Sequence, residues 1–224
     1  MGGRLLTGLL FVAVLAAGCG GGSSSSSSNG EAQKSGPQVY ADAKRATDGA
    51  TGVHLSGTFK DAGKSTTIDF VLGEQNGKGS MAQGKARAEI VRIGNTAYMR
   101  ASTEFWRTFA GAQAAPLLHD KWLQGSATKQ PFSGFAQFLS LSGLIGEAFK
   151  NPGKLTNLGE KTFKGQRVVA VKDSKDGSIL YVAATGTPYP VAALGAGTIT
   201  LTDWNKKVSV SAPKGAIDIS QFGG

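Results

Sequence analysis

The sequence predicts an α+β protein built on one strongly curled antiparallel sheet, a half-open β-barrel of about ten strands with helices on its concave side. Three observations predict this class. Apolar and polar residues alternate over many short segments, turn residues such as Gly and Asn separate those segments, and helical periodicity is confined to a few places. The 224 residues suffice for one domain with a full hydrophobic core, together with a tether.

The first part of the domain is expected to be one helix followed by hairpins. Small apolar residues recur at helical spacing over residues 38–51, and Gly52 is a plausible stop. The period then changes to two over residues 53–60 and again over residues 66–72, on either side of a turn at residues 61–63. Further strands are predicted over 77–83, 88–94 and 96–101.

The middle of the chain is expected to be helical. Residues 103–115 are predicted to form a short helix before Pro116, and residues 121–125 to be extended or a loop. Residues 132–150 place apolar side chains around most of a helix circumference, and Asn151-Pro152-Gly153 ends this pattern. A helix that is apolar around most of its circumference must be buried by other elements on several sides, so we expect it to lie against the sheet.

The rest of the chain shows only strand and turn patterns, without a convincing internal repeat. The strands are expected over 167–172, 178–184, 191–194, 197–204, 208–212 and 217–219.

The amino terminus carries an export signal. Residues 5–17 are predominantly apolar, which fits the roughly 7 to 15 residues of a signal-peptide core and falls short of the roughly 20 that span a bilayer. The small residues before Cys19 resemble the bacterial lipoprotein processing box. The resemblance implies a signal peptide over 1–18, cleavage between Gly18 and Cys19, and a diacylglycerol and palmitate anchor on Cys19. An ordinary cleaved signal peptide with an unmodified thiol, or a buried structural cysteine, is the alternative.

Residues 19–36 are expected to be a flexible tether. They are rich in Gly and Ser and contain few apolar side chains, so they cannot bury apolar surface. A random coil of this length lets the domain stand on the order of 20 Å from the membrane. Residues 37–224 then form the folded domain.

The charge is basic and dispersed. Lys and Arg number 24 against 15 Asp and Glu, which gives a net charge of +9. An exported, anchored chain meets anionic lipid headgroups and wall polymers rather than nucleic acid, so no nucleic-acid partner is expected, whereas a membrane or cell-wall protein partner is possible. An ordinary solvated surface explains the charge equally well. The expected location is the extracytoplasmic face of the cell membrane.

The residues that catalysis or metal binding requires are sparse. His54 lies on the polar face of a predicted strand, and His119 stands beside Asp120 in a predicted loop. The lone cysteine leaves no intrachain disulfide and no metal-ligand spacing. The pattern Ser-X-X-Lys occurs twice, at 126–129 and 211–214, without its companion motifs. The sequence therefore predicts no enzyme activity, no catalytic or metal-binding residues and no cofactor.

The carboxyl half resembles a known family of carriers. The stretch 176–190 with its Gly-Thr-Pro turn, the strand that ends at Trp204, the segment 208–210 and the closing residues 217–220 resemble the LprG-type lipid-carrying lipoproteins, which share their fold with the LolA-type carriers. The resemblance covers about residues 37–221. It implies a half-open barrel wrapped around helices, with an apolar cavity for acyl chains, and only Cys19 transfers by position.

Side-chain size is consistent with a cavity on the concave side. The chain has 33 Gly and only 8% aromatic residues, so small inward residues can leave space that bulky ones would fill. The candidate lining residues are Leu55, Phe59, Ile68, Phe70, Leu72, Phe135, Phe138, Leu139 and Ile145.

Two hypotheses follow, and an enzyme is the least favoured third one, because it would require a constellation centred on His119 in a cleft. In the first, an acyl chain or lipid occupies this cavity, the protein acts as a carrier or chaperone, and a mobile insertion between Pro131 and Gly153 opens and closes the mouth. In the second, the same side chains pack into a dry core, and the protein is a tethered interaction or regulatory module without a ligand.

Overall fold

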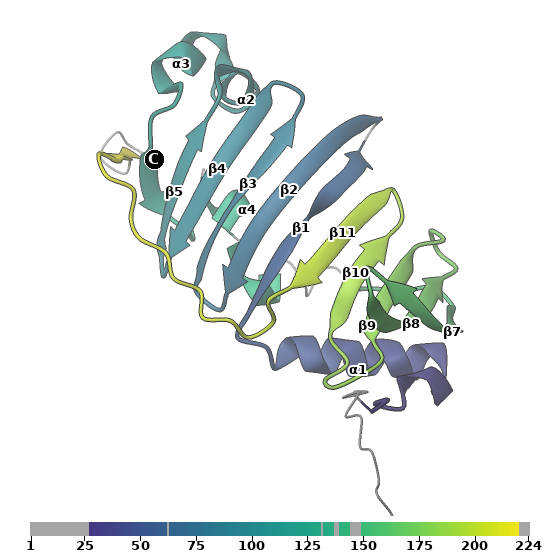
Figure 1. The fold of residues 1–224 in the computed structure, drawn as a ribbon. Helices are drawn as coiled ribbons and strands as arrows, with labels where there is room; N and C mark the ends of the chain where they lie inside the picture. The colour runs from purple at the N-terminus through teal and green to yellow at the C-terminus, as the bar shows by residue number, and fades with distance from the viewer. Residues whose placement is uncertain (1–26, 62, 131, 137–138, 144–148, 220–224) are drawn as a thin grey trace, which may run out of the picture.

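The computed structural model describes residues 27–61, 63–130, 132–136, 139–143 and 149–219. They form one twelve-stranded sheet in the order β12-β6-β5-β4-β3-β2-β1-β11-β10-β9-β8-β7, which Figure 1 shows as a single twisted and curled layer. The sheet is open, with β12 and β7 at its two edges. Adjacent strands are antiparallel, and the pair β12–β6 is the parallel exception. The predicted fold class is confirmed.

The strands are β1 (Gly52–Asp61), β2 (Lys64–Gly73), β3 (Asn76–Gln83), β4 (Ala86–Ile93), β5 (Thr96–Ala101), β6 (Leu123–Ser126), β7 (Leu155–Phe163), β8 (Gln166–Asp173), β9 (Ile179–Ala183), β10 (Pro190–Leu194), β11 (Gly197–Thr202) and β12 (Ile217–Asp218).

The seam between β1 and β11 joins the two halves of the sheet. β1 to β5 follow one another as antiparallel neighbours, and so do β7 to β11. Between these runs, β1 pairs with β11 from His54 opposite Thr202 to Phe59 opposite Gly197. The pairing therefore brings together residues that are more than 130 positions apart, and it creates the continuous floor on which the site is built.

The helices pack on one face of the sheet. They are η1 (Glu31–Gln33), α1 (Gly36–Asp48), α2 (Thr103–Phe109), α3 (Gly111–Leu118) and α4 (Ser133–Ala136). In Figure 1, α1 lies beside β8 to β10, whereas α2 and α3 lie at the opposite end of the molecule. No helix within the described residues is long and apolar enough to cross a membrane.

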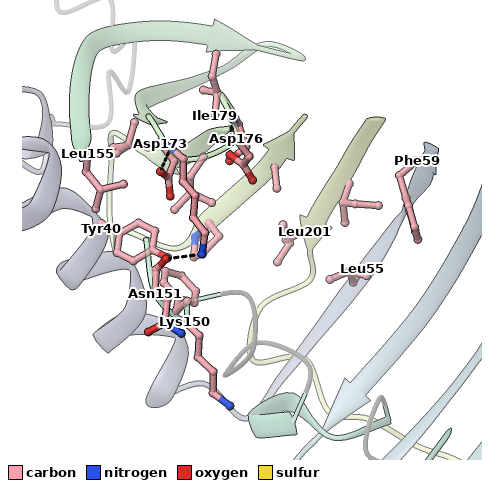
Figure 2. Close-up of a pocket in the computed structure, with 18 of the residues that line it drawn as sticks. Tyr40, Leu55, Phe59, Lys150, Asn151, Leu155, Asp173, Asp176, Ile179 and Leu201 are labelled. Carbon is pink, nitrogen blue, oxygen red and sulfur yellow. Dashed lines mark hydrogen bonds between the residues drawn. The ribbon is translucent and has the colours of Figure 1, made fainter. Parts of the chain in front are cut away.

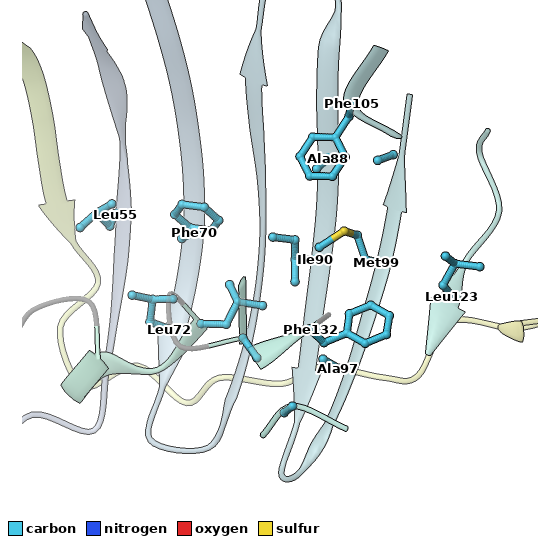
Figure 3. Packing of buried hydrophobic residues seen from close by; sticks show 14 of the residues in the cluster. Leu55, Phe70, Leu72, Ala88, Ile90, Ala97, Met99, Phe105, Leu123 and Phe132 are labelled. Carbon is cyan, nitrogen blue, oxygen red and sulfur yellow. The ribbon is translucent and has the colours of Figure 1, made fainter. Parts of the chain in front are cut away.

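Two buried clusters lie between the helices and this inner face. The larger cluster, drawn in Figure 3, joins Leu72, Ile90 and Met99 of the sheet to Phe132 and other residues of the segment after β6. The smaller cluster packs α1 onto β8 and β9. The half-buried ring of Phe149 contacts both clusters, so it links the two parts of the core.

The apolar segment 132–150 differs from the single helix that its composition predicts. The structure describes α4, a bend at Ser140 and a separate helical turn at residues 141–143. Ser140 breaks the helix because its Oγ accepts a hydrogen bond from the backbone N–H of Gly143 at 3.2 Å, which starts a new turn. Part of the predicted helix lies outside the described residues.

Three other predictions are corrected. Strand β7 is absent from the prediction because a bulge at Gly159, where φ is 79°, interrupts its alternation. Residues 208–212 alternate in sequence but do not form a strand. The helix predicted over 103–115 is two helices, because the chain turns at Gly111 with a φ of 84° and α3 runs on through Pro116.

The predicted tether is ordered in its second half. Ser28 forms a bridge to Thr185, and the Asn29 side chain donates hydrogen bonds to the carbonyls of Ala183 and Gly186. Asn157 Nδ2 donates to the carbonyl of Lys34 at 2.7 Å. Ser28, nine positions before the predicted boundary at 37, therefore already belongs to the folded unit, because specific polar contacts hold residues that lack apolar bulk.

Candidate functional site

A cavity of about 490 Å³ opens on the inner face of the sheet, between α1 and the strands on both sides of the seam. Figure 2 shows its side chains pointing toward one space from several elements. Its lining is Tyr40, Leu55, Phe59, Ile68, Phe149, Lys150, Asn151, Leu155, Val171, Asp173, Lys175, Asp176, Ser178, Ile179, Leu180, Pro190, Ala193, Ile199 and Leu201.

The floor of the cavity is apolar because of strand register. On the inner face, Leu55 of β1 is directly opposite Leu201 of β11. Farther across the sheet, Ile199 is opposite Ala193 of β10, and Ala193 is opposite Leu180 of β9. Ala193 remains exposed although it lies on the inner face. A small side chain at this register position leaves empty space above the sheet.

One wall of the cavity is made by α1 and the end of the segment 132–150. The rings of Tyr40 and Phe149 lie 4.9 Å apart between their centres. Burial of Tyr40 raises the pKa of its phenol, and the nearby Asp173 carboxylate acts in the same direction. The phenol is therefore neutral at physiological pH and offers a polar group inside a mostly apolar wall.

The mouth of the cavity is charged. Lys150, Lys175, Asp173 and Asp176 all belong to the lining, and three of them come from the end of β8 and the turn after it. The hydrogen bond from the Ser178 backbone lowers the pKa of Asp176, which keeps that carboxylate ionised. The lining thus carries two ammonium groups and two carboxylates, so its charged part, called the rim here, has no large net charge.

The rim also holds the end of the segment 132–150 in place. The Asp173 carboxylate accepts hydrogen bonds from the backbone N–H groups of Gly153 at 2.9 Å and Lys175 at 2.8 Å. Lys175 Nζ donates to the carbonyl of Asn151 at 3.1 Å. Lys154 and Ser174 add a further pair of hydrogen bonds. The chain that enters β7 is therefore fastened to the β8–β9 turn beside the mouth.

The structure separates the predicted lining residues. Leu55, Phe59 and Ile68 lie in the cavity lining. Phe70 and Leu72 share the inner face with them, but they pack into the larger core cluster and are not in the lining. The difference follows from position along β2, because the segment 132–150 covers one end of the strand and leaves the other end open.

The predicted residues of the segment 132–150 have other surroundings. Leu139 is fully buried in the larger cluster. Phe135 is half-buried, with its ring centre 5.8 Å from that of Phe105 and 5.2 Å from that of Phe109. Phe138 and Ile145 lie outside the described residues, as do Gly18 and Cys19.

The candidate catalytic groups lie away from this cavity. His54 Nε2 is 3.1 Å from Asp69 Oδ1, and His119 Nε2 is 3.3 Å from Asp120 Oδ2. None of these four residues belongs to the lining. Within the described residues, no group of three or more His, Cys, Asp or Glu side chains is arranged to hold a metal ion.

Sequence reasoning missed the half of the lining that comes from β7 to β11. The alternation of Ile199 and Leu201 in β11 and of Leu180 and Val182 in β9 carried the signal that these side chains share a face. Their place beside Leu55 depends on the pairing of β1 with β11, which no local pattern specifies. The charged residues of the rim occupy an ordinary turn, and only the tertiary structure brings them to the mouth.

Comparison with known proteins shows a similar fold. No protein-family model matches the chain, and no curated protein matches it. The crystal structure of LprF from Mycobacterium bovis is similar, with 18% identity, a TM-score of 0.52, and coverage of 84% of this chain and 100% of LprF. The crystal structure of the lipoprotein LppX from Mycobacterium tuberculosis matches at 19% identity and a TM-score of 0.45, over 78% of this chain and 99% of LppX. The likeness to LprF confirms the fold that the resemblance to LprG-type carriers implies.

Proposed function

We propose that this protein is a membrane-anchored extracytoplasmic lipoprotein that binds a lipid or an acyl chain and acts as a carrier or chaperone, not as an enzyme. The observation that carries this proposal is the cavity of about 490 Å³ with apolar walls and a charged mouth. Its size falls within the range of small-molecule sites, roughly 300 to 1,000 Å³. Apolar walls with a polar rim suit a ligand that has a hydrocarbon part and a polar end.

Binding is driven by removal of hydrocarbon from water. Each methylene that enters the cavity contributes about 0.8 kcal/mol. The ligand's polar end stays at the rim, where Lys150, Lys175, Asp173 and Asp176 offer both donors and acceptors beside solvent. A site of this kind holds its ligand without a covalent step, so the ligand can be passed on unchanged.

The anchor belongs to the same proposal. Cleavage after Gly18 would leave Cys19 as the lipid-modified amino terminus of the chain. Among the residues that the structure describes, Ser28 and Asn29 are the first that pack on the domain. Because a fully extended chain covers at most about 3.6 Å per residue, residues 20–27 span no more than about 29 Å. The cavity would therefore stay close to the membrane in which the anchor lies.

Native mass spectrometry tests the proposed ligand. The chain from residue 19 onward with Cys19→Ala, which lacks the apolar segment 5–17 and cannot carry diacylglycerol on residue 19, is purified from a lipid-containing host without detergent. We expect a co-purifying mass in the range of a lipid, released by organic solvent. Only the bare protein mass, together with no uptake of added fatty acid or lysolipid, would contradict the proposal.

A second candidate function is supported by the exposed tip of α2 and α3. Phe109 and Leu117 are 57% and 68% exposed, and residues 109–118 contain no charged side chain. Arg107 and Lys121 are exposed on either side of this stretch. An uncharged apolar tip with basic flanks is typical of a segment that enters the headgroup region of an anionic membrane. The tip would then hold the domain against the bilayer.

Vesicle flotation tests this second function. The chain from residue 19 onward with Cys19→Ala, which lacks the apolar segment 5–17, is mixed with phosphatidylglycerol vesicles, and Leu117→Ser is compared with Ile217→Ser, another exposed apolar residue. We expect a severalfold loss of binding from Leu117→Ser alone. Equal flotation of both variants would contradict a membrane contact through α2 and α3.

A further inference from the structure

The volume of the cavity limits how much hydrocarbon it can hold. A methylene group occupies about as much space as a water molecule in the liquid, roughly 30 Å³. On this scale, the cavity volume of about 490 Å³ corresponds to about sixteen methylenes. Two chains of that length would need about twice the volume.

Packed side chains prevent the cavity from extending along the inner face. On the side of β3 to β5, Leu72, Ile90 and Met99 are almost completely buried in the larger cluster. On the side of β8, Val39 and Ala43 of α1 are fully buried against the sheet. A second chain would have to displace these side chains, and the loss of their packing opposes that.

The two ends of the cavity differ in chemistry. Figure 2 shows Asp173 and Asp176 at one side, with Leu201 and Leu55 farther away and Phe59 beyond them. A ligand can therefore place one polar end at the charged rim and direct one hydrocarbon tail toward Phe59.

From the volume, the packed borders and the two unlike ends, we infer that the cavity holds one acyl chain, and that its ligand is a single-chain amphiphile such as a fatty acid or a lysolipid. This inference rests on the proposed function and narrows it, because that function alone allows lipids with several chains in the cavity.

The first test is a chain-length series. Affinities of the chain from residue 19 onward with Cys19→Ala are measured for saturated fatty acids and for lysophosphatidylcholines of ten to 22 carbons. We expect affinity to rise about fourfold per added methylene, as about 0.8 kcal/mol each implies, and to level off near sixteen carbons. A rise that continues to 22 carbons overturns the inference. No binding at any length contradicts the proposed function itself, which separates the two failures.

The two ligand series also identify the polar end. Tighter binding of the fatty acids at equal chain length assigns a carboxylate to the rim, and tighter binding of the lysolipids assigns a zwitterionic headgroup. Either result supports a single-chain ligand, provided that the plateau appears in both series.

The second test compares one chain with two. Lysophosphatidylcholine with one sixteen-carbon chain is compared with phosphatidylcholine that carries two such chains. If only one acyl chain enters the cavity, the second chain of phosphatidylcholine adds no binding free energy there. We therefore expect the affinities for lysophosphatidylcholine and phosphatidylcholine to agree within about threefold. Binding of the two-chain lipid more than tenfold tighter overturns the inference.

The third test fills the cavity. Ala193→Phe adds a ring on the inner face, where Ala193 is exposed to the cavity. The matched control is Thr198→Phe on β11, because Thr198 is exposed and belongs to the opposite face from Ile199. We expect the plateau to move to shorter chains for Ala193→Phe and to stay in place for the control.

Circular dichroism and thermal melting confirm that both variants fold. If Ala193→Phe does not fold, Ala193→Leu makes the same test with a smaller side chain. A folded Ala193 variant whose plateau equals that of the unchanged protein overturns the inference.

Discussion

At the scale of single residues, Glu31 is the most unusual group in the structure. Its side chain is only 2% exposed, and Glu31 Oε2 has no hydrogen-bond partner within the described part of the chain. Glu31 Oε1 accepts a hydrogen bond from Lys34 Nζ at 2.6 Å, and the same ammonium donates to Asp42 at 2.5 Å. One ammonium group therefore bridges two carboxylates and fastens the leading segment to α1, and Arg45 Nη1 supplies a second positive charge 2.9 Å from Asp42 Oδ1.

We expect Lys34→Met to lower the free energy of unfolding by about 1 to 3 kcal/mol, because it leaves the buried Glu31 carboxylate without its partner. Urea denaturation measures this change. Adding Glu31→Gln to the first substitution should recover most of the loss, since it removes the unpaired charge. If the double variant is less stable than Lys34→Met, the buried charge is not the cause.

The same ion pairs predict how stability depends on pH. The hydrogen bond from Lys34 holds the pKa of Asp42 below its usual 3.8, and the positive charges of Lys34 and Arg45 add to this effect. The ionised Asp42 carboxylate therefore makes its full contribution to the free energy of unfolding above about pH 4. This contribution is lost as the pH falls through the pKa of Asp42 in the folded state. The hydrogen bonds to Asp42 and Glu31 raise the pKa of Lys34 above 10.5. The Lys34 ammonium therefore makes its full contribution to the free energy of unfolding below about pH 10.5, and this contribution is lost as the pH rises through the pKa of Lys34 in the folded state.

We expect the melting temperature to fall at both ends of the pH range. Asp42→Asn should make the acid limb shallower, because the variant has no carboxylate to protonate at this position. Melting curves recorded from pH 2 to pH 7 measure the difference. An unchanged slope would show that other carboxylates control acid unfolding.

The residues of the site show which parts of it can be predicted from the sequence. Leu55, Phe59 and Ile68 were identifiable because period-two alternation places them on one face. The same alternation includes Phe70, which packs in the core. Alternation specifies the face but not what covers it. Ala193 could not be predicted as a lining residue, because the sequence does not distinguish an alanine that lines a cavity from an alanine that packs in a dense core.

At the scale of elements, local sequence patterns predicted the hairpin strands well. They predicted poorly the segment 132–150, which lies over the sheet. The hairpin of β1 and β2 agrees with the prediction because its partners are adjacent in the chain. Strand β7 was missed because a bulge interrupts its alternation, although it pairs at the edge of the sheet. Residues 208–212 were wrongly assigned to a strand, because they alternate but have no partner strand. The segment 132–150 has helical composition, but Ser140 caps a new turn within it.

The link between this segment and the β8–β9 turn predicts a local loss of order. Asp173→Ala removes the acceptor for the N–H groups of Gly153 and Lys175, so we expect these amides to exchange hydrogen much faster. Global stability should fall by only about 1 to 2 kcal/mol. Hydrogen exchange followed by mass spectrometry measures the effect.

Asp176→Ala is the matched control for this experiment. It removes a carboxylate from the same turn, and the hydrogen bond that it loses is the one from the Ser178 backbone. Exchange at residues 151–154 should remain slow in this variant. Equal exchange in the Asp173 and Asp176 variants would mean that the turn as a whole, and not Asp173, holds the segment.

At the scale of the whole molecule, the β1–β11 seam decides whether the cavity exists. It joins the two halves of the sheet, and the cavity takes lining residues from both. The sequence predicted the individual strands but not this order, because the pairing connects residues 144 positions apart, such as Ser56 and Thr200. Contacts of such long separation cost more chain entropy than the pairing of neighbouring strands, since the whole loop between them must be closed.

The close approach of the strands at this seam provides the last prediction. A Cβ at Gly57 would lie 2.1 Å from the carbonyl oxygen of Thr198, so Gly57→Ala must push β1 and β11 apart. We expect a loss of about 1 to 3 kcal/mol in unfolding free energy, and a loss of fatty-acid binding because the floor of the cavity separates. Gly134→Ala is the control, since no atom lies within 4 Å of its added Cβ. Guanidinium denaturation and binding titration measure both effects. Unchanged binding by a destabilised Gly57→Ala protein would show that the cavity does not depend on the seam.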